Sequence, residues 1–325
     1  MTAGLRIVST APVPPVAARA FARVGSIEVV SGVDADHSSL RDAEVLLVRG
    51  TQVSAAMIDA AARLRVIART GVGYDGVDVA AATERGIPVL YAPGAGTVPV
   101  AEGTVALMLA AAKRLNELGT IVRAGPWEAR YEVEAIDLRG AVLGIVGLGS
   151  IGREVARLGR AFGMVVVGCD PAFAPDVELG FVQRVGLEEL VGRSDVISLH
   201  CALTQHTRGM VDRALLRGVK PGAILVNVAR GAIVHSDDLL VEALDNGWLS
   251  AVALDVFAAE PPDPRHPLLS HPRVVCTPHS VGLTKRWSES VFAILADGVA
   301  CVLRGERPLH VVNPAALEHP SAATG

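Results

Sequence analysis

The sequence has little of what marks disulfide-rich, nucleic-acid-binding or membrane-spanning proteins. Its four cysteines stand far apart and form no Cys-x-x-Cys motif, which predicts reduced thiols in a cytoplasmic protein. It has no block of lysine and arginine, and its net charge is −4, which argues against a nucleic-acid partner and an anionic membrane surface. The most apolar helical stretch, residues 105–112, is far too short to span a bilayer, and the opening residues are unlike a signal peptide.

What is present is a pattern of short apolar runs that alternate with helical stretches. The 325 residues are long enough for two domains, and no repeat of 20–50 residues is visible. Strands are predicted at residues 5–9, 27–30, 45–48, 65–68, 88–90, 141–146, 164–167, 196–199, 224–227, 251–256 and 274–276. Such alternation predicts an α/β protein with parallel, doubly wound sheets.

Two longer helices help to divide the chain. One is predicted as a single helix from Val100 to Gly119, and its small apolar residues suit a spine between domains or a subunit contact. The other, from Lys285 to Leu303, is amphipathic and follows the last predicted strand, so we expect it to return to the first domain. The predicted domains are therefore residues 1–99 with 283–325, and residues 100–282.

A glycine-rich turn follows the strand at residues 141–146. Gly147, Gly149 and Gly152 form a G-x-G-x-x-G that opens a helix with an apolar stripe of Ile151, Val155, Leu158 and Phe162. The first glycine allows a tight turn, the second lets a pyrophosphate approach the backbone, and the third lets helix and strand pack closely. The helix N-terminus then offers unpaired N–H groups to the phosphates. The turn therefore predicts a dinucleotide site.

An acidic residue completes this unit. Asp170 ends the next strand, about 20 residues after the glycines, where a carboxylate can bind the ribose hydroxyls of the adenosine half. The same carboxylate repels a 2′-phosphate, and the following residues, 171–173, supply no arginine. NAD is therefore favoured over NADP.

Several loops at predicted strand ends carry candidate ligand-binding groups. Arg49 follows the third strand, and the loop at residues 69–75 has two glycines whose neighbouring N–H groups could bind a carboxylate or could form an ordinary turn. His266 and His271 flank a proline-rich loop, but no third ligand is suitably spaced, so no metal is expected. Cys201 is expected to pack rather than to act as a nucleophile.

The motifs taken together resemble one enzyme family. VARTGVGYDGVD, VAEGTVALML, GLGSIG followed by CDP, NVARG, ALDVFAAEP and TPH occur here in the order typical of the D-isomer-specific 2-hydroxyacid dehydrogenases. The resemblance covers residues 40–312 and implies a Rossmann NAD domain inserted in a flavodoxin-like substrate domain. It also implies a homodimer, and a small 2-hydroxy or 2-keto acid that binds in the cleft between the domains.

The resemblance implies a catalytic role for Arg230, Glu260 and His279. Arg230 would hold the substrate carboxylate and the C2 oxygen, which gives both orientation and charge stabilisation. His279 would exchange a proton with the C2 oxygen, as a general acid in reduction and a base in oxidation. Glu260 would pair with His279, since a carboxylate next to an imidazole favours and orients the protonated ring.

The resemblance also implies the ligand-binding residues. Those assigned to the cofactor are Gly147, Gly149, Ser150, Ile151, Gly152, Asp170, Thr204, Thr207, Ala229, Asp255 and Gly282, with Asp255 on the nicotinamide carboxamide. Those assigned to the substrate are Val72 and Gly73, through backbone N–H groups, and Arg49, which in phosphoglycerate-type members meets a distal anionic group. A solvent-facing Arg49 is the alternative.

Three positions depart from the family pattern. Gly96 stands where asparagine is frequent, Ala202 where proline is usual, and Val281 where glycine or alanine is usual, so that Val281 could narrow the pocket beside the nicotinamide. The expected reaction is reduction of hydroxypyruvate, glyoxylate or a similar acid, with oxidation of 3-phosphoglycerate as the close alternative. A different class, an NAD(H)-binding regulator with little turnover, is also considered; Glu260 argues against a formate dehydrogenase, which pairs its histidine with glutamine.

Overall fold

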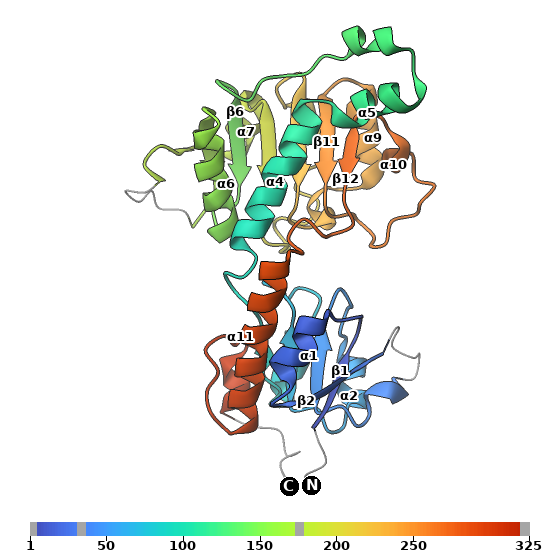
Figure 1. The fold of residues 1–325 in the computed structure, drawn as a ribbon. Helices are drawn as coiled ribbons and strands as arrows, with labels where there is room; N and C mark the ends of the chain where they lie inside the picture. Colours follow the sequence, from blue (N-terminus) through green and yellow to red (C-terminus); the bar gives the residue numbers. More distant parts are fainter. Residues whose placement is uncertain (1–4, 31–36, 173–178, 319–325) are drawn as a thin grey trace. The chain divides into compact units, whose positions relative to one another are not determined.

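Figure 1 shows the chain as a computed structural model, which describes residues 5–30, 37–172 and 179–318. The chain divides into two units, residues 1–96 with 283–325 and residues 97–282, each with its own sheet and core. The border between them falls at the start of a helix at Thr97, three residues before the predicted one. Within the described residues, no helix is long and apolar enough to cross a membrane.

The first unit is built on a parallel sheet of five strands in the order β2-β1-β3-β4-β5, which is the flavodoxin-like order. Its strands are β1 (Leu5–Ser9), β2 (Gly25–Val29), β3 (Val45–Val48), β4 (Val66–Arg69) and β5 (Val89–Leu90). Its helices are α1 (Pro15–Phe21), α2 (Ala55–Ala60), α3 (Val79–Glu84) and α11 (Lys285–Leu303), with 3-10 turns η1 (Ser38–Leu40) and η5 (Pro314–Leu317).

The residues of β3 explain why this sheet is covered on both faces. Val45 and Leu47 pack into a core with α1 and α11, whereas Leu46 and Val48 pack into a core on the other face. Because successive side chains of a strand point to opposite faces, a strand that is covered twice must be apolar throughout. Helix α11 contributes its predicted stripe, in which Val291, Leu295 and Val299 are buried, so the last long helix of the chain belongs to the first unit.

The second unit is a parallel sheet of seven strands in the order β12-β11-β10-β9-β6-β7-β8. The strands are β6 (Val142–Val146), β7 (Val165–Cys169), β8 (Gln183–Arg184), β9 (Val196–Leu199), β10 (Ala223–Asn227), β11 (Leu249–Leu254) and β12 (Val274–Cys276). The helices are α4 (Thr97–Ala112), α5 (Leu115–Ala124), α6 (Ser150–Ala161), α7 (Leu187–Arg193), α8 (Arg213–Arg217), α9 (Asp237–Asp245) and α10 (Pro267–Ser270), with 3-10 turns η2 (Trp127–Glu132) and η4 (Gly231–Ile233). Both sheets confirm the predicted fold class.

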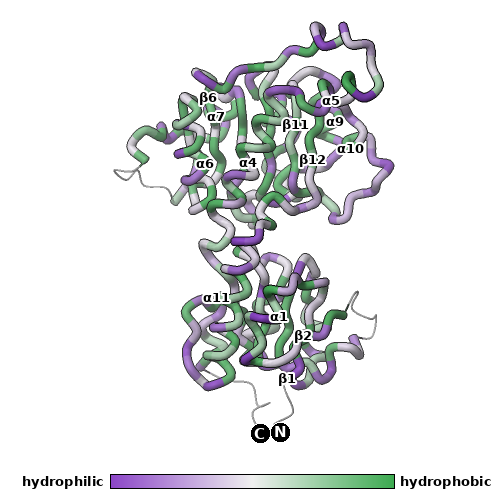
Figure 2. Tube along the Cα trace, in the orientation of Figure 1, coloured by the Kyte–Doolittle hydropathy of each residue, from purple (hydrophilic) through white to green (hydrophobic). Residues whose placement is uncertain are grey.

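The position of β6 locates the ligand site of this unit. The chain winds outward from β6 in both directions, through β7 and β8 on one side and through β9 to β12 on the other. Ligands of such sheets bind beyond the carboxyl ends of the strands, where the winding direction changes. Figure 2 shows the hydrophobic colouring of the central strands, which carry the core.

Two details of the sequence prediction were wrong. The single helix over residues 100–119 is two helices, because Arg114 adopts a left-handed conformation with φ of 54° between α4 and α5. Contacts with the sheet hold this turn: Arg114 Nη1 donates to the Ser250 carbonyl at 2.5 Å, and Asn116 Nδ2 donates to the Val274 carbonyl at 2.6 Å. Phe162 is 41% exposed rather than buried, since it caps the end of α6 instead of continuing its apolar stripe.

Helix α4 uses its apolar residues inside its own unit. It packs against α6 and along β10, β11 and β12 (Figure 1), with residues such as Leu107 and Met108 buried in the core. Gly103 and Val281 are in close contact there, because a Cβ added at Gly103 would lie 2.5 Å from the Val281 Cβ. Val281 therefore packs against α4, which gives this departure from the family pattern a packing role.

Candidate active site

The glycine turn after β6 has the geometry that a pyrophosphate requires. Gly147 has φ of 94°, and a Cβ there would lie 2.5 Å from the Cys201 backbone nitrogen. A Cβ at Gly152 would overlap the Gly147 carbonyl oxygen, so helix α6 can approach the turn only with glycine at this position. Gly149, by contrast, has open space where a Cβ would stand. The turn is therefore closed on the protein side and open in front of the N-terminus of α6, which fits a dinucleotide phosphate.

Asp170 lies at the end of β7 and braces the same turn. Its Oδ2 accepts from the Leu148 N–H at 2.7 Å, and its Oδ1 accepts from the Ala172 N–H at 2.8 Å. This bracing contact was not foreseen from the sequence, and it means that Asp170 holds the glycine turn as well as offering a carboxylate to a ribose. Phe173, named in the cofactor prediction, lies outside the described residues.

Thr204 and Thr207 form a small hydrogen-bonded loop after β9, the strand next to β6. The Thr204 N–H donates to Thr207 Oγ1 at 2.8 Å, and Thr207 Oγ1 donates to the Ala202 carbonyl at 2.6 Å. Cys201 precedes this loop, and burial raises the pKa of its thiol to about 11. A thiol that stays protonated packs but does not act as a nucleophile.

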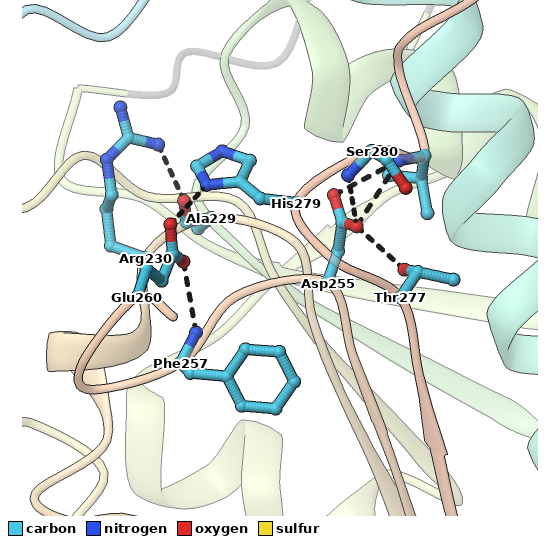
Figure 3. Close-up of polar contacts among 9 residues, drawn as sticks. Ala229, Arg230, Asp255, Phe257, Glu260, Thr277, His279 and Ser280 are labelled. Atoms are coloured by element: carbon cyan, nitrogen blue, oxygen red, sulfur yellow. Dashed lines mark hydrogen bonds and ion pairs between the residues drawn. The ribbon is translucent and has the colours of Figure 1, made fainter. Parts of the chain in front are cut away.

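Asp255 follows β11 and organises the loop that carries His279 (Figure 3). Asp255 is 3% exposed, and its carboxylate accepts from the Thr277 hydroxyl at 2.7 Å and from the Ser280 N–H at 2.7 Å. Burial raises the pKa of Asp255, and these hydrogen bonds partly oppose that increase. His279 itself has φ of 52°, a conformation that is costly for a residue with a side chain, and its N–H donates to the Asp255 carbonyl at 2.8 Å. Asp255 thus fixes the backbone on which the imidazole stands.

Glu260 and His279 form the most distinctive contact of the site. His279 Nδ1 lies 2.7 Å from Glu260 Oε2, and the other carboxylate oxygen, Oε1, accepts from the Phe257 N–H at 3.1 Å. Burial alone raises the pKa of Glu260, but the hydrogen bond and charge of His279, the Phe257 N–H and the charge of Arg230 outweigh it and hold the pKa below its usual value. Because Nδ1 is engaged, Nε2 is the ring nitrogen that can exchange a proton with a bound molecule.

Arg230 follows β10 and lies beside this pair (Figure 3). The Arg230 Nη1 donates to the carbonyl of the preceding residue, Ala229, at 2.6 Å. Asn227, which is fully buried, ties the loop together: its Nδ2 donates to the Arg230 carbonyl at 2.9 Å and its Oδ1 accepts from the Ala229 N–H at 3.1 Å. Arg230, Glu260 and His279 come from three separate stretches of the chain, and they meet because β10, β11 and β12 are neighbours that end at one edge.

An apolar pocket of about 390 Å³ borders the Glu260–His279 pair. Its other lining residues are Phe257, Pro261, Pro262, Leu269, Cys276, Thr277 and Pro278. The side chains of His279 and Glu260 are 44% and 38% exposed, so the pair is open to this pocket.

The residues that the resemblance assigns to the substrate lie in the first unit. Val72 and Gly73 are in the loop after β4, and Val72 is 40% exposed. Arg49 follows β3, its N–H donates to Thr10 Oγ1 at 3.0 Å, and its guanidinium lies 5.5 Å from the centre of the Phe292 ring. Burial lowers the pKa of Arg49, and its Nη1 is buried without a hydrogen-bond partner among the described residues. Arg49 is therefore not the solvent-facing residue of the alternative prediction.

The histidines of the proline-rich loop have other partners. His266 Nε2 lies 3.2 Å from Asp238, and His271 Nε2 lies 3.7 Å from Asp245. In the part of the chain that the structure describes, no group of three or more histidine, cysteine or carboxylate side chains could hold a metal ion.

Comparison with known proteins identifies the family. Residues 105–281 match the family model described as D-isomer specific 2-hydroxyacid dehydrogenase, NAD binding domain. The chain belongs to this family. It is 39% identical over 285 residues to a glyoxylate reductase of Aeropyrum pernix, a match that covers 85% of this chain and 84% of that protein.

Two further relatives extend the comparison. A D-3-phosphoglycerate dehydrogenase of Methanocaldococcus jannaschii is 40% identical over 314 residues, which cover 95% of this chain but 59% of that protein. The chain thus spans little more than half the length of that relative. The crystal structure of the TT0316 protein from Thermus thermophilus matches with a TM-score of 0.86 and 36% identity, covering 95% of this chain and all of that one.

Proposed function

We propose that this member of the family is an NAD-dependent oxidoreductase that interconverts a small D-2-hydroxy acid and the corresponding 2-keto acid. The observation that carries the proposal is the 2.7 Å contact between His279 Nδ1 and Glu260, beside Arg230 and at the strand edge next to the dinucleotide turn. A proton donor, its acidic partner and a fixed cation together match what reduction of a keto acid requires.

The residues proposed to hold the cofactor surround the strand ends. They are Gly147, Gly149, Ser150, Ile151 and Gly152 for the pyrophosphate, Asp170 for the ribose, and Thr204, Thr207, Ala229, Asp255 and Gly282 elsewhere along the cofactor. The open space at Gly149 supports a dinucleotide, and the acid after β7 supports NAD rather than NADP. When bound, NAD supplies or accepts the hydride at C2 of the substrate.

Residues of the protein stabilise the negative charge of the substrate and exchange a proton with it. Arg230 binds the substrate carboxylate and stabilises negative charge on the C2 oxygen. His279 donates a proton from Nε2 to that oxygen in reduction and removes it in oxidation. Glu260 holds Nδ1, so it orients the ring with Nε2 free to exchange the proton. Val72 and Gly73 offer backbone N–H groups to the carboxylate.

We propose reduction of hydroxypyruvate, glyoxylate or a similar small acid as the reaction, with oxidation of 3-phosphoglycerate as the close alternative. One of the relatives described above is named a glyoxylate reductase and the other a D-3-phosphoglycerate dehydrogenase, and these names correspond to the two reactions. The buried, unpartnered Nη1 of Arg49 supports the alternative, because 3-phosphoglycerate has a phosphate besides its carboxylate, whereas glyoxylate and hydroxypyruvate have one anionic group each.

A panel of substrates tests the proposal. We expect loss of NADH absorbance with glyoxylate or hydroxypyruvate, and slower change with larger apolar 2-keto acids. Formation of NADH from 3-phosphoglycerate, with no reduction of either keto acid, would establish the alternative. Tight NADH binding without turnover of any acid would favour an NAD(H)-binding regulator instead.

Cofactor choice gives a separate prediction. Asp170→Ala should raise the Kd for NADH about 10- to 100-fold, as expected when hydrogen bonds to a charged group are lost. The same substitution should reduce the ratio of the Kd for NADPH to the Kd for NADH. Fluorescence titration with both cofactors measures the two constants. Asp170→Asn is the matched variant, because it keeps an oxygen for the Leu148 N–H but loses the charge. An unchanged NADH to NADPH ratio in both variants would show that the ribose lies elsewhere.

We also propose a cytoplasmic homodimer. The cysteines of the described residues are all free, which suits a reducing compartment. Apolar side chains are exposed along α5 and η2, where Val122 is 68%, Trp127 57% and Tyr131 78% exposed, and such a patch is typical of a subunit contact. Light scattering on the purified protein gives the mass that decides this point.

A further inference from the structure

Arg184 brings a positive charge to the end of β7 from a later part of the chain. β8 is an edge strand of the second sheet, and its register places Arg184 beside Gly168 of β7, two residues before Asp170. The Arg184 Nη2 donates to the Pro171 carbonyl at 3.3 Å, across 13 residues of sequence. Its guanidinium therefore lies against the residue that follows Asp170, although residues 171–173 themselves include no arginine.

The guanidinium of Arg184 is exposed, and the group that it binds is a neutral carbonyl. Within the described residues, no carboxylate lies at ion-pair distance from it. The thiol of Cys169, the last residue of β7, lies within range of both neighbouring charges. Burial and the charge of Asp170 raise the pKa of this thiol, and the charge of Arg184 opposes that increase. The end of β7 therefore has an acid and a cation close together, from two different strands.

The acid of this place is fixed, whereas the cation is available. Both oxygens of the Asp170 carboxylate accept backbone hydrogen bonds, from Leu148 at 2.7 Å and from Ala172 at 2.8 Å. In dinucleotide folds of this kind, an acid at this strand end binds the ribose 2′-hydroxyl of NAD, and a nearby arginine accommodates the 2′-phosphate of NADP. The described chain offers both groups at one strand end.

We propose that Arg184 is a specificity-determining residue for the cofactor: it binds the 2′-phosphate of NADP, so the protein discriminates against NADP less strongly than Asp170 alone would dictate. The inference rests on the proposed function of Asp170 at the ribose. A guanidinium binds phosphate through parallel, charge-assisted hydrogen bonds, which are stronger than its bond to the Pro171 carbonyl. NAD has a hydroxyl in place of this phosphate, so Arg184 gains no such bonds with NAD.

Fluorescence titration of the full chain with NADH and with NADPH tests the proposal. We expect Arg184→Gln to raise the Kd for NADPH about 10- to 100-fold, the scale of lost hydrogen bonds to a charged group, and the Kd for NADH less than about 2-fold. Arg184→Lys keeps the charge without the planar fork and should recover part of the NADPH affinity. Thermal unfolding of each variant reports whether the fold is intact.

A second background keeps the test decisive if NADPH binds weakly to the unaltered protein. Asp170→Asn removes the negative charge and keeps an acceptor for the Leu148 N–H, so it should lower the Kd for NADPH. Adding Arg184→Gln to this variant should raise that Kd again by about 10-fold or more.

Arg193 provides the matched control, because it is an exposed arginine that contacts the other residue of β8. Its Nη2 donates to Gln183 Oε1 at 2.9 Å, and its Nη1 lies 2.5 Å from Glu189. Successive residues of a strand point to opposite faces, so Arg193→Gln removes the same charge from the other face of β8. We expect it to change neither Kd by more than about 2-fold.

The inference would be overturned by an equal effect of Arg184→Gln on the two cofactors. An unchanged Kd for NADPH when Arg184→Gln is added to Asp170→Asn, or no NADPH binding by Asp170→Asn itself, would also overturn it. Reduction of a keto acid by the unaltered protein with NADH would leave the proposed function standing in each of these cases. Absence of that reaction, together with loss of NADPH affinity in Arg184→Gln, would remove the proposed function and keep the assignment of Arg184.

Discussion

Replacing His279 by alanine is expected to lower kcat by about 10²- to 10⁴-fold, the usual range for losing a general acid, while the Kd for NADH stays nearly the same. The imidazole is held by Glu260 through Nδ1, and its own backbone is held by Asp255, so its place in the site depends on two acids. Loss of the ring removes the proton donor without disturbing the glycine turn after β6. Steady-state kinetics with the best keto acid, and fluorescence titration of NADH, measure the two quantities.

A second histidine provides the control for this result. His271 also lies near a carboxylate, that of Asp245 at 3.7 Å, and its Nδ1 accepts from the Arg273 N–H at 3.1 Å. His271→Asn keeps an acceptor for that N–H and should preserve kcat. If His279→Ala abolished NADH binding, or lowered kcat no more than His271→Asn does, His279 would be a structural residue and the proposed mechanism would be wrong.

Replacing Arg230 by glutamine is expected to lower kcat/KM about 10²- to 10³-fold, as found when a donor to a developing oxyanion is removed. The substitution should change kcat/KM for the keto acid by a larger factor than the Kd for NADH, because the guanidinium is proposed to contact the substrate. Arg230→Lys keeps the charge but lacks the planar fork that binds a carboxylate with two parallel hydrogen bonds, so we expect it to recover only part of the activity.

The control for Arg230 is an arginine of the same unit that has a packing role. Arg217 lies 5.4 Å from the centre of the Trp248 ring, and Arg217→Gln should leave kcat/KM unchanged. Arg230 also lowers the pKa of Glu260 through its charge. The glutamine variant with wild-type kcat/KM would show that the substrate carboxylate binds to another cation, and Arg49 would then be the residue to test.

The strands that are apolar runs were predictable because each is a local feature of the sequence, whereas β8, the exposed pair Gln183–Arg184, has no such run and was missed. The residues of β3 form a continuous apolar run, and a parallel strand that is covered on both faces needs just such a run. The break at Arg114 was not predictable in the same way, because residues 100–119 have a uniform helical composition. The turn there depends on hydrogen bonds to Ser250 and Val274, which lie far away in the sequence.

The residues of the candidate site also fall into two groups, those that motifs predicted and those whose role only the folded structure shows. Motifs led to Arg230, Glu260 and His279, and the structure describes their geometry. The motif NVARG includes Asn227 but did not show its role, which is to support the arginine loop, and no motif showed the second role of Asp170, whose carboxylate holds the Leu148 N–H. A side chain that acts by holding a backbone group has no chemical signature of its own, and only the folded chain shows what it holds.

The sequence alone determined the class of fold, the dinucleotide turn and the family, since all three depend on residue types at short spacings. Only the tertiary structure decided the order of the strands, the break between α4 and α5, the packing of Val281 on Gly103 and the contact of Glu260 with His279. The physical reason is that these features arise between residues that are distant along the chain, and such contacts depend on how whole elements pack rather than on any local pattern.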